Sequence, residues 1–302
     1  MQFELVGVPY TSMAEPGGIA RAIDVLRSAG LVDRLQTAGD VVDAGDLSLT
    51  EGDGVRGASG FLNEAALGRL VVATREAVAS SHDRHRLPLL VGGDCPVLLG
   101  ALAATRDRHG ACGLLLVDGH EDAWPPSLSP TGEVSDSEVG LALGLGGDAL
   151  PDPLRALIPL LVPEGVAMLG PRDRKEIDDA GASSLDKTVA LFLDDAAVRA
   201  YGAPASIYQA VAAFRLAVPA FWLHPDLDVL RTEELAAVDY PQSGGLTWLE
   251  LSDICSLAVT TRGCAGVSIV IYNPDKDQDG AAAERILSFA ADLVATTSEN
   301  SF

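Results

Sequence analysis

The stretch Gly113-Leu-Leu-Leu-Val-Asp-Gly-His-Glu-Asp122 decides the predicted fold. The apolar run Leu114–Val117 is short and follows a glycine, which is typical of a buried strand in a parallel sheet. Directly after it come Asp118, His120 and Asp122, a mixed oxygen and nitrogen set that suits a divalent metal. In open α/β sheets, sites are built at the carboxyl ends of strands. The stretch therefore predicts a metal site at the end of a central strand, although a solvated acidic turn has the same composition.

Two further segments have the same organisation. The run Ala220–Asp228 passes from apolar residues into alternating carboxylates, and Leu87–Cys95 passes from apolar residues into Gly-Gly-Asp-Cys. If the three strands are neighbours, their carboxyl ends meet at one edge of the sheet. Enough ligands for two metal ions that share carboxylates would then lie together. The candidate metal ligands are Cys95, Asp118, His120, Asp122, Asp226 and Asp228.

Strands and helices are expected to alternate along the chain. Strands are predicted at 3–9, 87–95, 114–117, 166–170, 189–193, 220–228 and 266–272. Helices are predicted at 19–29, 62–80, 97–108, 173–180, 204–216, 247–259 and 280–295. Residues 40–60 are rich in Gly, Asp and Ser and are predicted to form a loop. Alternation of this kind predicts an α/β fold in which a parallel sheet is covered by helices on both faces, a three-layer αβα arrangement.

Composition narrows the possible partners. The formal charge of −22, with only 21 Lys and Arg, disfavours nucleic acid and anionic membranes, because phosphate binding requires a clustered basic face. No apolar run reaches the roughly 18 residues of a membrane span. The first residues, Met1–Val6, contain no basic segment, so we expect no secretory signal and a cytoplasmic protein. Four cysteines without CxxC spacing indicate free thiols.

The order of these motifs resembles the arginase/agmatinase (ureohydrolase) superfamily. The family motifs Gly-Gly-Asp-His, Asp-Ala-His-x-Asp and Asp-x-Asp correspond to Gly92–Cys95, Asp118–Asp122 and Asp226–Asp228. Further matches lie at Gly7–Tyr10, Leu169–Asp173, Ser243–Thr247 and Tyr272–Pro274. The resemblance implies one arginase-like domain over residues 1–302, with an eight-stranded parallel sheet and two Mn²⁺ ions. It also implies a small-molecule substrate and a homo-oligomer, a trimer or hexamer.

The resemblance also implies roles for the ligands. Asp118 and Asp226 would bridge the two ions, Asp122 would complete the first site, and His120 and Asp228 the second. Two such ions lower the pKa of a bound water and orient the resulting metal-bound hydroxide toward an sp² carbon. In the family that carbon belongs to a guanidino or amidino group, and a C–N bond is cut.

Three positions depart from the family pattern. Cys95 replaces a histidine; its softer thiolate suits Zn, Fe or Co better than Mn, and a buried thiol that binds no metal is an equal alternative. Val139 stands where a proton-shuttling histidine would be, which leaves Glu138 or Asp136 to transfer protons. Ile271 stands where a glutamate would pair with the substrate guanidinium.

The Ile271 substitution bears on the substrate. Without a partner, a buried guanidinium costs several kcal/mol of desolvation, so the substrate is expected to be neutral or differently charged unless Asp275 or Asp277 pairs with it.

Three interpretations of the function follow from these residues. The first is a metal-dependent hydrolase that cleaves a C–N bond of a guanidino or amidino compound, with Asp122 and Glu138 as candidate catalytic carboxylates. The alternative is a catalytically impaired relative that binds metal or another subunit. A related fold that uses a single metal for deacylation is the third interpretation.

Overall fold

The computed structural model describes residues 1–15 and 17–299. Its centre is an eight-stranded sheet in the order β2-β1-β3-β8-β7-β4-β5-β6, and every neighbouring pair is parallel. The strands are β1 Phe3–Gly7, β2 Val41–Asp46, β3 Leu87–Val91, β4 Gly113–Val117, β5 Val166–Gly170, β6 Leu191–Asp194, β7 Phe221–Pro225 and β8 Cys264–Ile269. The predicted eight-stranded parallel sheet is confirmed.

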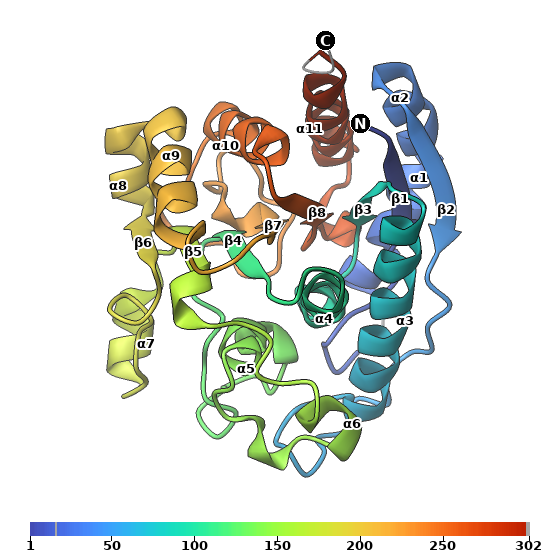
Figure 1. Cartoon of the computed structure of the whole chain (residues 1–302). Helices are drawn as coiled ribbons and strands as arrows, with labels where there is room; N and C mark the ends of the chain where they lie inside the picture. Colours follow the sequence, from blue (N-terminus) through green and yellow to red (C-terminus); the bar gives the residue numbers. More distant parts are fainter. Residues whose placement is uncertain (16, 300–302) are drawn as a thin grey trace.

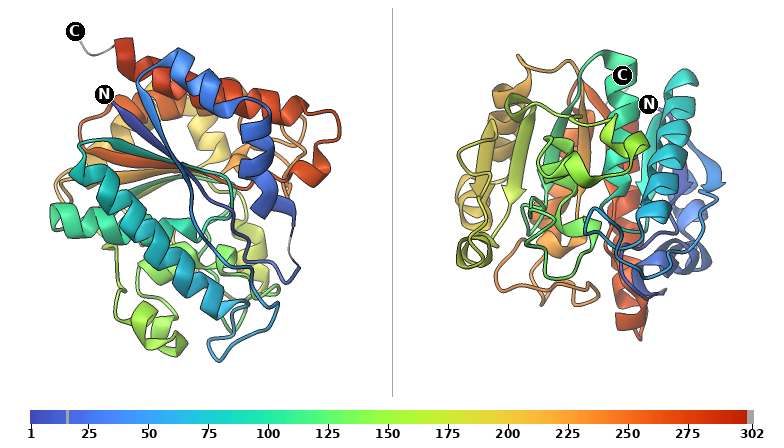
Figure 2. Two further views of the ribbon diagram at one scale, coloured as in Figure 1. Left: turned by 90° about the vertical axis from the view of Figure 1, so that its right-hand side faces the viewer. Right: turned by 90° about the horizontal axis from the view of Figure 1, so that it is seen from below.

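Helices cover both faces of the sheet (Figures 1 and 2). One layer holds α2, α9, α10 and α11, and the opposite layer holds α3, α4 and α5. The helices are α1 Ala22–Ser28, α2 Leu31–Ala38, α3 Glu64–Asp83, α4 Val97–His109, α5 Glu138–Ala142, α6 Asp152–Arg155, α7 Arg174–Asp179, α8 Asp195–Tyr201, α9 Ala203–Phe214, α10 Trp248–Thr260 and α11 Ala281–Glu299. The three-layer αβα prediction is therefore confirmed.

The predicted loop at 40–60 was wrong at its start, because Val41–Asp46 forms the edge strand β2. Only Val41 of this strand is buried, and the strand has no strict apolar alternation that would reveal it in the sequence. Arg27 of α1 donates to the carboxylates of Asp43 and Asp46 at 2.8–2.9 Å. β2, the strand that the sequence did not reveal, is thus a charged edge strand that pairs with β1.

The three motif-bearing strands are not all direct neighbours. β4 and β7 lie side by side, but β8 lies between β7 and β3. The register pairs Val117 with Pro225, and the backbone N–H of Asp226 donates to the carbonyl of Val117 at 2.9 Å. The acidic segments after β4 and β7 therefore begin at the same level of the sheet, whereas Cys95 reaches them from across β8.

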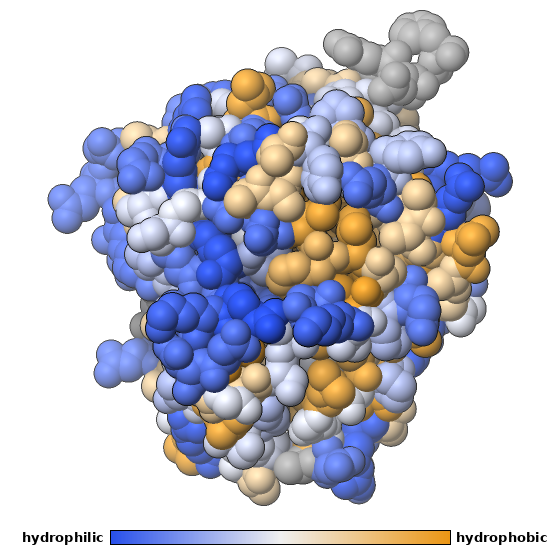
Figure 3. All heavy atoms as spheres, turned by 90° about the vertical axis from the view of Figure 1, so that its left-hand side faces the viewer, coloured by the Kyte–Doolittle hydropathy of each residue, from blue (hydrophilic) through white to orange (hydrophobic). Residues whose placement is uncertain are grey.

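Apolar side chains fill the interior, as the central strands require. All residues of β1, β3, β4, β5 and β7 are buried, which fits a parallel sheet covered on both faces. Figure 3 views the side that carries β6 and α8, where an apolar area lies within a mostly hydrophilic surface. Within the described ranges, no helix combines the length and apolar character that crossing a membrane requires.

The capping box at the start of α10 provides a stability test. The Thr247 hydroxyl accepts the N–H of Glu250, and the Glu250 carboxylate accepts the N–H of Thr247. We expect Thr247→Ala to lower the free energy of unfolding by about 1 kcal/mol, because the N–H of Glu250 loses its hydroxyl acceptor at the start of the helix. Urea denaturation measures this. Thr50→Ala, in an exposed loop, is the control and should change it by less than about 0.5 kcal/mol; equal effects of the two changes would show that the box contributes nothing.

Candidate metal centre

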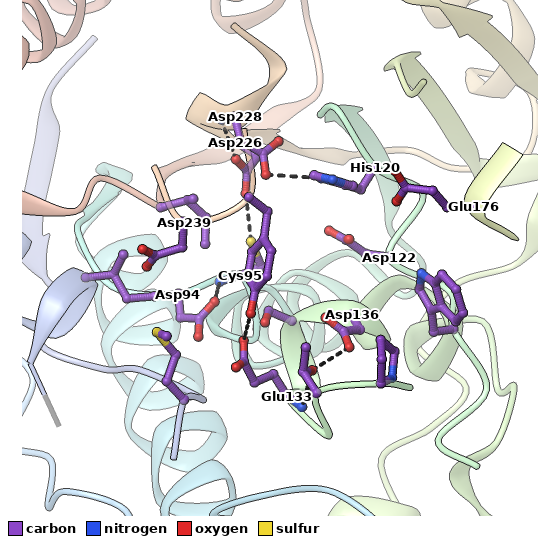
Figure 4. Close-up of a pocket in the computed structure, with 18 residues that line it drawn as sticks. Asp94, Cys95, His120, Asp122, Glu133, Asp136, Glu176, Asp226, Asp228 and Asp239 are labelled. Atoms are coloured by element: carbon purple, nitrogen blue, oxygen red, sulfur yellow. Dashed lines mark hydrogen bonds and ion pairs between the residues drawn. The ribbon is translucent and has the colours of Figure 1, made fainter. Parts of the chain in front are cut away.

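The candidate ligands converge at the carboxyl end of the sheet. Cys95 follows β3, the run Asp118–Asp122 follows β4, and Asp226 and Asp228 follow β7. They surround a pocket of about 140 Å³ (Figure 4). Of the predicted ligands, those that line the pocket are Cys95, His120, Asp122, Asp226 and Asp228. The structure therefore brings distant segments together around one cavity, with the fully buried Asp118 beside it.

Asp118, His120 and Asp228 form a compact group of possible ligands. One ligand atom from each lies within 4.8 Å of the others. The Nδ1 atom of His120 lies 3.1 Å from Asp228 Oδ2 and 3.7 Å from Asp118 Oδ1. The Oδ2 atom of Asp118 is buried and has no hydrogen-bond partner. An unpaired buried carboxylate oxygen is costly, so this group fits a divalent cation.

Local backbone contacts hold the carboxylates in place. Asp118 Oδ1 accepts the N–H of His120 at 2.7 Å, and Asp226 Oδ1 accepts the N–H of Asp228 at 2.7 Å. The side chain of Arg172 donates to the carbonyl oxygen of Asp228 at 2.7 Å. These bonds use one carboxylate oxygen of Asp118 and one of Asp226. Other carboxylate oxygens remain directed at the cluster. Arg172 binds backbone, so no lysine or arginine side chain among the described residues replaces a metal in this cluster.

Burial and mutual repulsion control the charges of the cluster. Burial raises the pKa of Asp118, Asp122 and Asp226, and neighbouring carboxylates raise them further. Burial also opposes charge on Asp228 and on His120. Several neighbours together outweigh burial, however: His120 and Arg172 lower the pKa of Asp228, and Asp228 and Asp118 raise that of His120 well above its usual value. A bound divalent cation would replace these protons as the compensating positive charge.

Asp94 lines this pocket and has a structural role there. Its Oδ2 accepts the N–H of Ser12 at 2.7 Å and also the Ser12 hydroxyl, and its Oδ1 accepts the N–H of Cys95 at 2.9 Å. Burial raises the pKa of Asp94 to about 6. Asp94 therefore fixes the loop after β1 to the start of α4, and with it the position of Cys95.

The three departures from the family pattern occupy different places. Val139 is buried in α5 and has no group that could transfer a proton. Glu138, the first residue of α5, is fully buried and is not among the residues that line the pocket. Glu138 is therefore a buried helix residue and not a solvated loop carboxylate. Ile271 does line the pocket, and its φ of 72° is rare for a β-branched residue, which indicates local strain.

Neither Asp275 nor Asp277 supplies the missing partner for a cationic substrate. Asp275 pairs with Arg21, and Asp277 accepts hydrogen bonds from Tyr272 and from the first turn of α11. Other carboxylates line the pocket instead. They are Asp94, Glu133, Asp136, Glu176 and Asp239.

Sequence reasoning overlooked Glu133, Glu176 and Asp239, since they come from loops and a short helix without a motif. Among the lining residues there is no lysine or arginine.

The fold and the acidic cluster define an α/β protein with a candidate metal centre at the carboxyl end of its sheet. The sequence comparison then identifies the family, because the family model described as "Arginase family" matches residues 1–297. The chain belongs to the arginase family. Enzymes of this family act on C–N bonds of guanidino and amidino compounds with a binuclear metal centre, usually of Mn²⁺. The recognition made from the three motifs is confirmed.

Individual relatives agree with this assignment. An arginase from Bacillus caldovelox is 24% identical over 300 residues, covering 96% of each chain. The solved structure of arginase from Bacillus caldovelox has a TM-score of 0.83 at 22% identity and covers 100% of this chain and 99% of that chain. The proclavaminate amidino hydrolase of Streptomyces clavuligerus has a TM-score of 0.72 at 18% identity and covers 98% and 91%. The structural matches support the fold over the full length of the chain.

The buried carboxyl groups predict how pH affects the metal-free protein. Burial raises the pKa of Glu133 and of Asp173 to about 7. In the unfolded chain such groups have pKa values of about 4. The folded state therefore holds protons that the unfolded chain has released, and stability is lost as pH rises from about 4 through about 7. We expect the melting temperature of metal-free protein to fall between about pH 5 and pH 8, as measured by calorimetry.

Added Mn²⁺ should raise the melting temperature, and more so at about pH 8, because the ions bind deprotonated carboxylates. Asp173→Asn should flatten the decline in metal-free protein, whereas the exposed Asp253→Asn should leave it unchanged. A metal-free melting temperature that rises steadily over this range would contradict the charge assignment.

Proposed function

We propose that the chain hydrolyses a C–N bond of a cationic guanidino or amidino small molecule, with water activated by divalent ions as the nucleophile. The observation that carries this proposal is the pocket itself. Carboxylates line it, and no lysine or arginine is among the lining residues. Such a pocket attracts a cation and excludes an anion. The arginase and amidino hydrolase names of its relatives support the same class of substrate.

The ligand set fits two divalent ions. We propose that Asp118, Asp226 and Asp122 hold ions together with His120 and Asp228, and that the ions are Mn²⁺ as in the family. Bound there, divalent ions would act as Lewis acids and lower the pKa of a coordinated water. The unpartnered Oδ2 of Asp118 and the repulsion among the buried carboxylates support this assignment.

Glu133 and Asp239 are the proposed partners of the substrate cation. The Oδ1 atom of Asp239 accepts from Lys276 and Asn273, but its Oδ2 is buried and has no hydrogen-bond partner. Glu133 accepts the hydroxyl of Tyr240 at 3.0 Å. Both carboxylates line the pocket that contains Ile271. They would therefore provide the negative charge that the family places at the position of Ile271.

We assign proton transfer to a carboxyl group in this pocket. Val139 offers none, and Glu138 lies outside the lining. Asp122 and Asp136 both line the pocket, and Asp136 accepts the hydroxyls of Ser129 and Thr131 at 2.7 and 2.6 Å. We propose Asp122 as the group that takes the proton from water. The Oδ2 atom of Asp136 already accepts the Ser129 and Thr131 hydroxyls, so we propose that Asp136 orients the substrate.

The alternative of a catalytically impaired metal-binding protein is favoured by one observation, the buried valine at position 139. It predicts metal binding without turnover. A panel of guanidino and amidino compounds, assayed with Mn²⁺, Co²⁺, Ni²⁺ and Zn²⁺ added separately, separates the two functions. Turnover of any cationic member supports the hydrolase, whereas bound metal with no turnover across the panel supports the alternative.

Asp228→Asn tests the metal assignment. This change keeps the shape of the side chain but removes the charge that faces His120. We expect kcat/KM to fall at least about 100-fold, since changes even to residues behind metal ligands cost about 10-fold to 100-fold. Bound Mn²⁺, measured by mass spectrometry, should fall in parallel. The exposed Asp253→Asn is the control, and an Asp228→Asn variant with full activity would exclude Asp228 as a ligand.

Glu133→Gln tests substrate recognition. The pKa of Glu133 is raised to about 7, first by burial and then by the charge of Asp94. Deprotonation of Glu133 strengthens cation binding, so KM of the parent enzyme should fall as pH rises through about 7. Glu133→Gln should raise KM about 10-fold at pH 8, since a hydrogen bond to a charged group contributes about 1.5–3 kcal/mol, and should remove this pH dependence. An unchanged KM profile would show that Glu133 does not contact the substrate.

Assembly, domain organisation and location are proposed on family grounds. We propose one domain over residues 1–302 that assembles as a trimer or hexamer in the cytoplasm. Two large apolar side chains of the exposed surface, Tyr208 of α9 and Leu216 just after it, are available for contacts between copies. Size-exclusion chromatography with light scattering gives the mass, and a monomer at micromolar concentration would exclude the oligomer.

A further inference from the structure

A second group of possible metal ligands lies next to the pocket. It consists of Cys95, Glu138 and His224, each of which offers one ligand atom within 4.8 Å of the other two. All three side chains are at least 98% buried. Glu138 and His224 do not line the pocket, and only Cys95 belongs to both regions. The group therefore shares no residue with the Asp118, His120 and Asp228 cluster, although it borders the carboxylates of Asp226 and Asp122.

The fold brings these three side chains together from different elements. Cys95 lies just before α4, and Glu138 is the first residue of α5, which contacts α4 on one face of the sheet (Figure 1). His224 lies in β7, where side chains alternate between the two faces, so it shares a face with Trp222 and Asp226. The Asp226 carboxylate accepts the thiol of Cys95 at 2.8 Å. The group thus occupies the space between the sheet and the amino ends of α4 and α5.

Three polar atoms of this group have no hydrogen-bond partner in the described protein. Both carboxylate oxygens of Glu138 and the Nε2 atom of His224 are buried without a hydrogen bond. Buried polar groups of native proteins are almost always paired, because an unpaired one costs free energy comparable to a lost hydrogen bond. Unpaired atoms on two neighbouring buried side chains, Glu138 and His224, therefore indicate a ligand that the polypeptide does not itself supply.

The other nitrogen of His224 is held in a way that suits metal binding. Its Nδ1 lies 2.5 Å from the hydroxyl oxygen of Ser268 on β8, which also accepts the indole N–H of Trp222 at 2.9 Å. A hydroxyl oxygen has two lone pairs and can accept from both groups. With its proton on Nδ1, His224 presents a lone pair at Nε2. Metal-binding histidines are oriented in this manner by a partner on the second nitrogen.

We propose that Cys95, Glu138 and His224 form a buried site for one Zn²⁺-type ion, distinct from the Mn²⁺ ligands of the pocket. Thiolate, carboxylate and imidazole are ligands of zinc in proteins. One thiolate and one carboxylate balance the charge of a divalent ion, so the occupied site is neutral and can be buried. The thiolate also selects Zn, Fe or Co against Mn. This assignment gives the cysteine at position 95 a function that a buried thiol alone lacks.

The site also affects the pocket. Asp226 is both the acceptor of the Cys95 thiol and a proposed ligand of the pocket ions. A metal ion at Cys95 removes the thiol proton and so removes the hydrogen bond to Asp226. The buried ion is thereby coupled to the pocket through a single carboxylate. Binding of this ion does not require turnover, so it can be tested independently of catalysis.

Direct observation of the ion in the parent protein is the first test. Protein freed of metal, loaded with Zn²⁺ and dialysed should retain zinc, and anomalous scattering at the zinc edge should place an ion against Cys95 Sγ and His224 Nε2. Zinc found only among Asp118, His120 and Asp228, or no retained zinc, would overturn the proposal. This measurement needs no variant and does not depend on activity.

Cobalt substitution is the second test. Co²⁺ bound by a thiolate gives a near-ultraviolet charge-transfer band, which carboxylate sites lack. We expect the band in the parent and its loss in Cys95→Ser, with a strong decrease in His224→Asn and Glu138→Gln. Cys112→Ser is the matched control, since Cys112 is also buried but lies away from the group. Asp228→Asn should retain the band, because Asp228 belongs to the other cluster.

Ser268→Ala tests the orientation of His224. The variant keeps all three ligands but removes the partner of Nδ1, so zinc affinity should fall about 10-fold to 100-fold. Circular dichroism and melting temperature establish that each variant is folded. A cobalt band that persists in Cys95→Ser, or disappears equally in Cys112→Ser, would refute the site.

Discussion

The burial of like charges at the carboxyl ends of β4 and β7 is the constraint on which this structure depends. The hydrogen bond from the N–H of Asp226 to the carbonyl of Val117 aligns the two strands, so the acidic turns that follow them must share one small volume. Water cannot screen carboxylates at such depth, and protons or cations must compensate them. The apolar strands below fix the positions, and the loops above add further carboxylates to the lining of the pocket. Fold and chemistry are therefore linked through this one alignment.

Much of the site could be predicted because its residues directly follow apolar strands. Asp118, Asp226 and their neighbours follow apolar runs that identify strands, and they have the spacing of metal-binding motifs. Both features place them at one edge of the sheet. Glu133 and Asp239 have neither, since they belong to loops whose position depends on tertiary packing. His224 was overlooked for another reason: it lies inside β7, where a histidine in an apolar run is usually a core residue. Only the coordinates bring it beside Glu138 and Cys95.

The prediction of the fold from the sequence was limited in a similar way. The buried central strands have continuous apolar runs that identify them, whereas β2 is an edge strand with mostly exposed residues and escaped detection. Short helices such as α2 and α8 were also missed. Sequence alone also did not show that β8 separates β3 from β7. Strand order follows from crossovers and packing, which no local pattern contains. This order explains why Cys95 approaches the other ligands from one side and can join a different group.

The charged edge formed by β2 has a consequence for assembly. An unpaired outer strand normally offers its N–H and carbonyl groups to a strand of another molecule. Here Arg27 is bound between Asp43 and Asp46, so any incoming strand would meet fixed charges along this border. Fibrous growth by strand addition is thereby discouraged at this end of the molecule. Any contact between copies at this border would have to use helices and loops, which leaves the sheet finite at β2.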